Sequence, residues 1–332
     1  MLITSRAFLL LACAFLCAQA HAFGAAGHRA VGTIADELIA GTNAAKEVRK
    51  ILGSNLRTAS VWADCAKGVN TTTFKYGGDG KYPECAVYEN PGSKAQMVAF
   101  VRRNVGNCTS AHGAEVCHKQ YHYTDVAVQR EAYVKGQVGT SDQDVVAAVA
   151  AMIAVLQGNE APEPFRIAGK KEALRLLSHY LGDIHQPLHV AAVYLDTDGQ
   201  VVDPDEGVFD PATETQGGNV LMLGTKRLHG EWDSVGGVVT SSPLPPGILK
   251  KARAVPATSG PMEQWSTAWA SEVLVDGKVA FEGLSYSAED AKKHRYQVTL
   301  PAGYNQMKAQ VQREQVIKAG ARLAQILTTL WP

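Results

Sequence analysis

The chain has 332 residues, and its 32 basic and 32 acidic residues give a formal net charge of zero at pH 7. The sequence has no overall excess of lysine and arginine and no basic patch that indicates a nucleic-acid surface. A polyanionic ligand would therefore need another source of positive charge.

Residues 1–22 have the pattern of a secretory signal peptide. Arg6 supplies the positive start, an apolar run covers residues 7–17, and Ala20-His21-Ala22 is a small-x-small cleavage site. We expect cleavage between Ala22 and Phe23, which makes the protein secreted or periplasmic. The apolar run is too short to span a bilayer comfortably and no later run is long enough, so we expect no membrane span.

The sequence after residue 22 shows no linker and no internal repeat, so we expect one domain over residues 23–332. Apolar periodicity and capping residues predict a mainly α-helical fold with a few short strands. The expected helices cover residues 24–39, 43–52, 56–68, 94–105, 141–156, 170–186, 261–275, 288–295 and 304–330. Residues 121–126 are aromatic and β-branched, which favours an extended segment. The irregular stretch 192–219 is long for a compact domain unless it is functional.

Four cysteines remain after the expected cleavage, an even number in an oxidising compartment, which favours two disulfides. Three pairings are possible. We favour the local pairs Cys65–Cys85 and Cys108–Cys117, because both close short loops rich in Gly, Asn and Thr. Thiolate zinc ligation is the alternative, but the spacings contain no CxxC pair.

Two HxxxD steps predict a metal site. His179 and Asp183 are four apart in an apolar-periodic segment, so they lie on one face of a helix, and His229 and Asp233 repeat the spacing. Pro187 ends or kinks the first helix, which lets His189 approach the same volume. Converging imidazoles and carboxylates are typical zinc ligands. Surface or hydrogen-bonded core histidines are the alternative, which the repeated spacing disfavours.

The remaining histidines lack this pattern. His185 points away from the HxxxD face, so we interpret it as a structural residue that orients a ligand. His112, His118 and His294 have no carboxylate at ligand spacing and are interpreted as ordinary loop or surface histidines.

The motifs together resemble the S1/P1 nucleases, secreted zinc enzymes that cut single-stranded DNA and RNA. The resemblance covers most of the chain after residue 22, in family order. It rests on Phe23-Gly24-Ala25-Ala26-Gly27-His28, Trp62-Ala63-Asp64-Cys65-Ala66-Lys67, His122-Tyr123-Thr124-Asp125, the segment from His179 to His189, Gly217-Gly218-Asn219, and His229-Gly230-Glu231-Trp232-Asp233.

The resemblance implies a helical fold around three zinc ions and a set of ligands for each ion. One zinc would be held by Asp64, His122, His179 and Asp183, and a second by His189, His229 and Asp233. The third would take His28, a bridging oxygen of Asp183, and the free amine and carbonyl oxygen of Phe23. Many members have tryptophan at this position, but the ligating atoms are backbone atoms that both residues possess.

The resemblance also implies the chemistry. A zinc-activated hydroxide would attack the phosphodiester in line and leave a 5′-phosphate product. Asp64 and Lys67 are the catalytic candidates, with Lys67 offsetting charge on phosphorus, although a solvated surface lysine is the alternative. Tyr123 would stack on a base, Asp125 would bind its edge, and Gly217 and Asn219 would line the same pocket; core packing is the alternative for Tyr123.

Two other functions fit parts of the pattern. The zinc phospholipases C resemble this group in fold and in their three zincs, but their last ligand pair ends on glutamate, whereas this chain has Asp233. A non-catalytic exported zinc-binding protein is the second alternative. Structural zinc sites fill all four positions with protein ligands, and the His189, His229 and Asp233 set has only three. We therefore expect a monomeric nuclease that acts on single-stranded DNA and RNA, with duplexes and 3′-nucleotides as secondary substrates.

Overall fold

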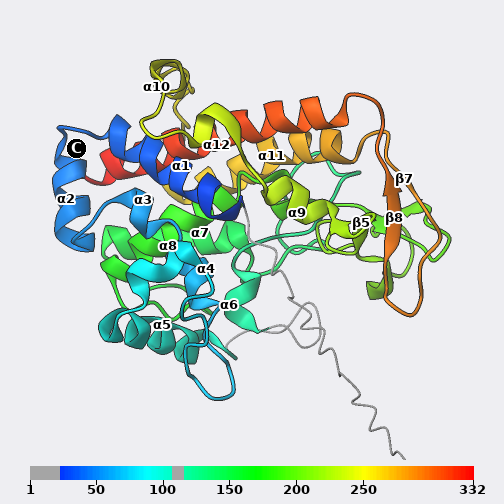
Figure 1. Ribbon diagram of the computed structural model, residues 1–332, viewed down its shortest axis with the longest axis horizontal. Helices are drawn as coiled ribbons and strands as arrows, with labels where there is room; N and C mark the ends of the chain where they lie inside the picture. Colours follow the sequence, from blue (N-terminus) through cyan, green and yellow to red (C-terminus); the bar gives the residue numbers. More distant parts are fainter. Residues whose placement is uncertain (1–22, 107–115) are drawn as a thin grey trace, which may run out of the picture.

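The longest helix, α12 (Tyr304–Leu330), is the element against which many others pack. The computed structural model describes residues 23–106 and 116–332. In Figure 1, α12 runs across the molecule, and α1 (Gly24–Leu38) and α8 (Lys170–Asp183) both contact it. The other helices are α2 (Asn43–Leu52), α3 (Leu56–Ala59), α4 (Trp62–Ala66), η1 (Pro83–Tyr88), α5 (Pro91–Asn104), α6 (Cys117–Gln120), α7 (Val145–Gln157), η2 (Pro187–His189), η3 (Pro211–Thr213), α9 (Leu228–Asp233), η4 (Gly237–Thr240), α10 (Pro246–Arg253), η5 (Met262–Gln264) and α11 (Trp265–Phe281).

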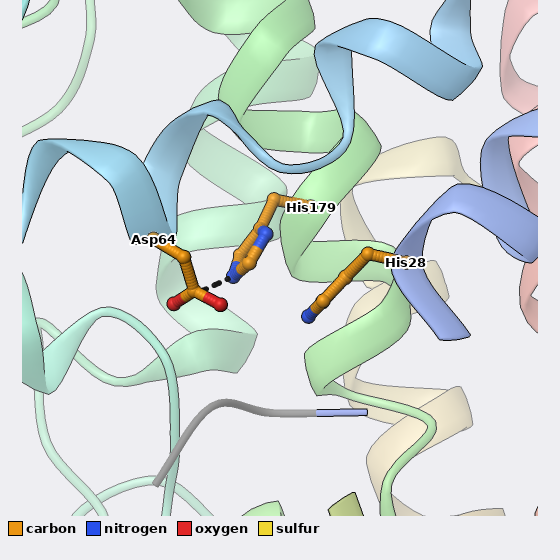
Figure 2. A group of neighbouring side chains, drawn as sticks. All are labelled: His28, Asp64 and His179. Carbon is orange, nitrogen blue, oxygen red and sulfur yellow. Dashed lines mark ion pairs between the residues drawn. The ribbon is translucent and has the colours of Figure 1, made fainter. Parts of the chain in front are cut away.

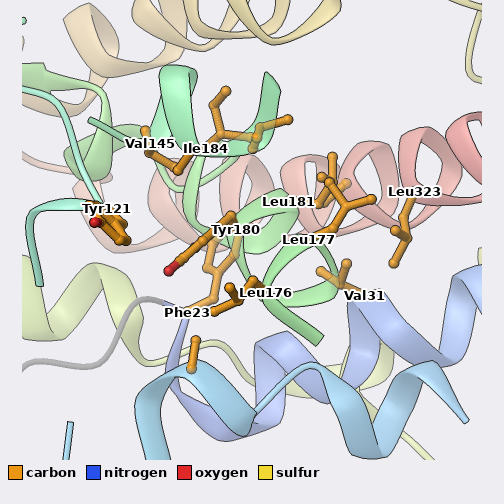
Figure 3. Packing of buried hydrophobic residues seen from close by; sticks show 14 of the residues in the cluster. Phe23, Val31, Tyr121, Val145, Leu176, Leu177, Tyr180, Leu181, Ile184 and Leu323 are labelled. Atoms are coloured by element: carbon orange, nitrogen blue, oxygen red, sulfur yellow. The ribbon is translucent and has the colours of Figure 1, made fainter. Parts of the chain in front are cut away.

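Helix α8 is buried on all sides from Glu172 to Asp183. Leu176, Leu177 and Leu181 pack in the core with side chains from α1 and α12, as Figure 3 shows. Each such side chain contributes roughly 1.5–3 kcal/mol through its removal from water. Because the apolar residues surround α8, its polar residues are held in the interior as well. The fold class expected from the sequence, a mainly helical domain with few short strands, is confirmed.

The strands are short and serve mainly to connect site segments. The parallel pair β1 (Val126–Ala127) and β2 (Ala191–Ala192) pairs Val126 with Ala191 and Ala127 with Ala192. β3 (Tyr194–Leu195) pairs with β4 (Val201–Val202) in antiparallel register. A four-stranded sheet has the order β6-β5-β8-β7, from β5 (Leu221–Leu223), β6 (Lys226–Arg227), β7 (Ser285–Tyr286) and β8 (Tyr296–Thr299). The β5–β6 hairpin leads directly into α9.

Several helix boundaries differ from expectation for local reasons. The expected helix 56–68 is split into α3 and α4, because the Ser60 carbonyl turns to accept a hydrogen bond from His179 Nδ1 at 2.6 Å. Helix α7 begins at Val145 rather than 141, because Asp144 is the cap and accepts from two backbone N–H groups. Helix α8 ends at Asp183 as the chain tightens into successive turns before Pro187.

One expected helix was wrong and one observed helix was not expected. Residues 288–295 form a turn rather than a helix, closed by a hydrogen bond from Asp290 N to Arg295 O at 2.8 Å between β7 and β8. Helix α10 was not expected from the sequence. The expected helix 261–275 becomes the short η5 turn followed by α11, which extends to Phe281.

The disulfide Cys65–Cys85 is present and joins α4 to η1. It fixes the short helix that carries Asp64 and precedes Lys67. Cys117 is buried at the start of α6. The expected partner, Cys108, lies outside the described residues, so the Cys108–Cys117 pair stays a prediction.

His118 is buried on α6 rather than at the surface, which corrects its interpretation. Burial lowers the pKa of its imidazole to about 3, so the unfolded chain takes up this proton at a higher pH than the folded chain. Stability from this residue is therefore complete above about pH 6.5 and falls as the pH decreases toward 3. Between pH 7 and pH 5 the loss is about 2 kcal/mol. Urea unfolding at both pH values measures the free energy of unfolding. Its decrease from pH 7 to pH 5 is expected to be smaller in a His118→Gln variant by this amount. An equal decrease in the variant and the wild-type protein would contradict the prediction.

Candidate metal centre

Three helices bring the first ligands together. On α8, His179 Nε2 lies 3.3 Å from Asp183 Oδ2. The ring of His28, from α1, stacks on His179 with 3.7 Å between centroids. Asp64, from α4, places Oδ1 3.6 Å from His179 Nε2. Figure 2 shows how His28, Asp64 and His179 converge from separate elements, and all are buried.

Asp183 faces two sets of ligands. Its Oδ1 lies 3.4 Å from His28 Nε2, whereas Oδ2 lies 2.8 Å from Nδ1 of His122, which follows α6. His122 Nδ1 is also 3.1 Å from His179 Nε2. A carboxylate whose two oxygens point to different imidazoles is positioned to bridge two cations.

A further group lies in η2, which follows α8, and on α9. His189, in η2, places Nε2 3.0 Å from Nε2 of His229. Asp233, one turn after His229, has Oδ1 3.8 Å from His189 Nε2 and Oδ2 3.6 Å from His229 Nε2. All three side chains are buried.

Backbone carbonyls set the protonation of these imidazoles. His189 Nδ1 lies 2.6 Å from His122 O, and His229 Nδ1 lies 2.8 Å from Gly217 O. A carbonyl oxygen only accepts, so Nδ1 carries the hydrogen and the neutral ring presents a lone pair at Nε2. The two Nε2 lone pairs of His189 and His229 therefore face each other at close range. This contact requires a positive charge between them.

Burial makes a proton an unfavourable source of that charge. It lowers the pKa of His229 to about 4 and holds the pKa of His189 well below its usual value. Burial also lowers the pKa of His179 to about 4 and raises the pKa of Asp183 to about 7. One oxygen each of Asp183 and Asp233 has no hydrogen-bond partner among the described residues. Imidazole lone pairs and carboxylate oxygens together fit a divalent metal ion.

The described residues contain three candidate metal-binding groups, each with ligand atoms within 4.8 Å of one another. They are His28, Asp64 and His179; His122, His179 and Asp183; and His189, His229 and Asp233. Every side chain that the sequence analysis proposed as a ligand is in one of them. The structure brings these residues together from six separate segments of the chain.

Phe23 is completely buried and directly precedes α1, the helix that carries His28. Its backbone is in the left-handed region, with φ of 33°. Its carbonyl accepts the N–H of Gly27 at 3.0 Å, which leaves the second lone pair of that oxygen for another partner. Its proposed role as an N-terminal ligand stays a prediction.

The expected catalytic and substrate residues lie beside the ligands. Lys67 Nζ is 2.9 Å from Asp64 Oδ1 and is largely buried, unlike a solvated surface lysine. Asp125 is buried and acts electrostatically on His229. Tyr123 is half-buried and lines a cavity of about 80 Å³. Asn219 donates to Gln216 O at 3.0 Å, at the turn that also contains Gly217.

Some supporting residues were not found from the sequence. Ser60 contributes only its backbone carbonyl, which leaves no side-chain signal. Gly217 was expected in the substrate pocket, but the contact of its carbonyl with His229 was not expected. Phe209 comes from the irregular stretch 192–219 and lines the same cavity as Tyr123. Gln186 donates to Asp233 Oδ1 at 2.8 Å. Its position, as a polar residue between the ligands Asp183 and His189, was the sequence signal that could have identified it.

The other histidines have separate partners. His185 Nδ1 lies 2.7 Å from Leu181 O, and Arg322 Nη1 lies 2.8 Å from His185 Nε2. Both ring nitrogens are therefore occupied by protein groups. His294 Nδ1 lies 2.7 Å from Glu289 Oε1, so it does have a carboxylate partner, five residues earlier. His112 lies outside the described residues.

Gly182 makes room for His28. A methyl group at this position would lie 2.6 Å from His28 Nδ1. A Gly182→Ala variant is therefore expected to displace the His28 ring, lose one metal ion per chain and lose about 1–3 kcal/mol of stability. Elemental analysis after dialysis measures the first effect and urea unfolding the second. Gly247→Ala, where the same methyl meets nothing within 4 Å, is the control that keeps the full metal content. Unchanged metal content in Gly182→Ala would contradict the prediction.

The helical fold and the three buried groups of His and Asp side chains define a candidate helical metalloprotein. Residues 23–331 match the family model of the S1/P1 nucleases, and the chain belongs to this family. Membership makes it a nuclease, a hydrolase that acts on nucleic acid. A search of curated proteins finds no match. In the part of the chain that the structure describes, no helix has the length and apolarity needed to cross a membrane.

Proposed function

We propose that the protein is a zinc-dependent phosphodiesterase that hydrolyses single-stranded DNA and RNA to 5′-phosphate products, with duplexes and 3′-nucleotides as further substrates. One observation carries the proposal. Buried His and Asp side chains form three candidate metal-binding groups, two of which share His179, in a chain of the S1/P1 family. Their donor atoms are the types that suit zinc.

The proposed ligand sets hold three zinc ions. Asp64, His122, His179 and Asp183 hold one; His189, His229 and Asp233 hold another; and His28, Asp183 and the Phe23 amine and carbonyl hold the third. Bound there, zinc supplies a net local charge of about +3 after three carboxylates and lowers the pKa of water toward neutrality. This is the source of positive charge that the balanced overall composition lacks.

The protein's own residues orient the substrate and balance its charge. Lys67 places its ammonium beside Asp64, where it offsets negative charge that develops on the phosphate. Tyr123 offers a ring on which any base can stack, and Asp125 accepts a hydrogen bond from the base edge. Asn219 and Gly217 complete the proposed base pocket. Stacking explains a broad sequence tolerance and a preference for strands whose bases are unpaired.

The proposal also covers cleavage of the signal peptide, the compartment and the oligomeric state. Residues 1–22 are the proposed signal peptide, cleaved before Phe23, and residues 23–332 are the proposed catalytic domain. The buried disulfide Cys65–Cys85 supports an oxidising compartment, secreted or periplasmic. The expected oligomeric state is a monomer.

The test uses the exported, processed protein. We expect three zinc ions per chain by elemental analysis, cleavage of a short single-stranded oligonucleotide to 5′-phosphate ends, and loss of cleavage after chelation with recovery on adding zinc. Cleavage of phosphatidylcholine with the oligonucleotide left intact would support the phospholipase alternative. A zinc-loaded protein that cleaves neither would support the non-catalytic alternative.

A further inference from the structure

The carboxylate of Asp233 is held by a residue outside the proposed ligand sets. We propose that Gln186 is a positioning residue for the His189, His229 and Asp233 group, whose amide decides which oxygen of Asp233 is presented to the metal. This inference rests on the proposed function, because it requires that the group binds a metal ion.

Gln186 lies in the turn between two ligand segments. It follows Asp183 at the end of α8 and precedes His189 in η2, and it is completely buried. Its backbone N–H donates to Asp183 O at 2.9 Å. The backbone of Gln186 is therefore tied to one ligand residue while its side chain reaches Asp233, 47 positions later in the sequence.

The orientation of the Gln186 amide follows from its partners. Oε1 accepts the backbone N–H of Leu188 at 2.5 Å. A backbone N–H only donates, so the atom that faces it must be the carbonyl oxygen. The Nε2 group must then be the atom that lies 2.8 Å from Asp233 Oδ1. The side chain thus caps the turn that carries His189 and donates to Asp233.

This hydrogen bond leaves Asp233 with one oxygen for a metal ion. Oδ1 accepts from Gln186, whereas Oδ2 has no hydrogen-bond partner among the described residues and lies 3.6 Å from His229 Nε2. The imidazoles of His189 and His229 are oriented by backbone carbonyls, which substitution does not remove. Gln186 is the side chain through which the orientation of this group can be tested. Substitution of a residue that hydrogen-bonds to a metal ligand typically weakens metal binding 10–100-fold.

The decisive variant is Gln186→Glu. It keeps the shape of the side chain and the acceptor for Leu188 N–H, but it places a carboxylate oxygen against Asp233 Oδ1. We expect the variant to retain two tightly bound zinc ions and to bind the remaining one about 10–100-fold more weakly. Zinc content is measured by elemental analysis during titration with a chelator. Visible spectra of the cobalt-substituted protein report which coordination environment is lost.

Gln315→Glu is the matched control. Gln315 is buried on α12 and donates to the carboxylate of Asp276, a pair without any proposed ligand. Gln315→Glu makes the same chemical change at a buried amide–carboxylate pair. The variant protein is therefore expected to lose stability but to keep all three metal ions. If Gln186→Glu does not fold by circular dichroism, Gln186→Met, which lacks both donor and charge, is measured instead with the same expectation.

The outcomes separate the two proposals. If the wild-type protein binds three metal ions tightly and the Gln186 variant binds all three equally tightly, the positioning role alone is overturned. Equal weakening of all three metals, as for a general loss of structure, also overturns it. Wild-type protein that binds no metal overturns the proposed function and this inference with it.

Discussion

Asp183→Asn is expected to lower kcat/KM for a single-stranded oligonucleotide by about 10³-fold or more and to reduce the metal content by at least one ion per chain. Asp183 Oδ1 faces His28 and Oδ2 faces His122, so one residue supports two metal positions. The asparagine amide has no negative charge, and its NH₂ group points hydrogens, rather than a lone pair, toward one of the two metal positions. A loss of this size corresponds to about 4 kcal/mol of transition-state stabilisation, comparable to removal of one preorganised electrostatic group.

The control for this variant is Asp276→Asn. Asp276 is a partly buried carboxylate on α11 whose pKa is raised by burial and whose partner is Gln315. The same Asp→Asn change there is expected to leave metal content and kcat/KM unchanged. Metal analysis and kinetics on both variants, each with folding checked by circular dichroism, make the comparison. An Asp183→Asn protein that retains three metals and more than a tenth of the activity would rule out a bridging role for this carboxylate.

Local sequence signals predicted the helices that have clear ends. Helix α2 has the expected bounds because Thr42 caps its start and Gly53, with φ of 68°, ends it. Helix α12 likewise covers the expected residues 304–330. The HxxxD spacing on α8 and α9 placed each His above its Asp, since residues four apart share a helix face.

Contacts between distant segments could not be predicted in this way. The stacking of His28 on His179 depends on Gly182, which leaves space for the ring, and on the packing of α1 against α8. The parallel pairing of β5 with β8 joins Leu221 to Tyr296, and no local pattern specifies that register. The split between α3 and α4 follows from a hydrogen bond to His179 that is formed only in the folded chain.

The family resemblance supplied the parts of the site that spacing alone does not. Asp64 and His122 lie on separate short segments without a repeated pattern, yet both converge on α8. Gln186 is the opposite case, because its neighbours in sequence were recognised as ligands while its own contact with Asp233 was not expected. Ligand identity was therefore predictable from motifs, whereas the groups that orient the ligands required coordinates.

One extra residue before Phe23 is expected to remove one of three zinc ions and most of the nuclease activity, while the fold survives. The reason is that an acylated nitrogen has no lone pair for a metal, whereas the free α-amine of Phe23 does. Two secreted proteins, one beginning at Phe23 and one with an added Ala, are compared by elemental analysis, oligonucleotide cleavage and thermal unfolding. Equal zinc content and activity in both forms would exclude the N-terminal amine as a ligand.

Phe23→Trp separates the role of the backbone from that of the ring. The ligating atoms are unchanged, so zinc content and activity are expected to be preserved. The side chain of Phe23 is completely buried. The larger indole must therefore displace its neighbours, at an expected cost of about 1–3 kcal/mol in stability. Loss of a zinc ion in this variant, with the amine still free, would mean that packing of the side chain rather than the amine controls the third metal position.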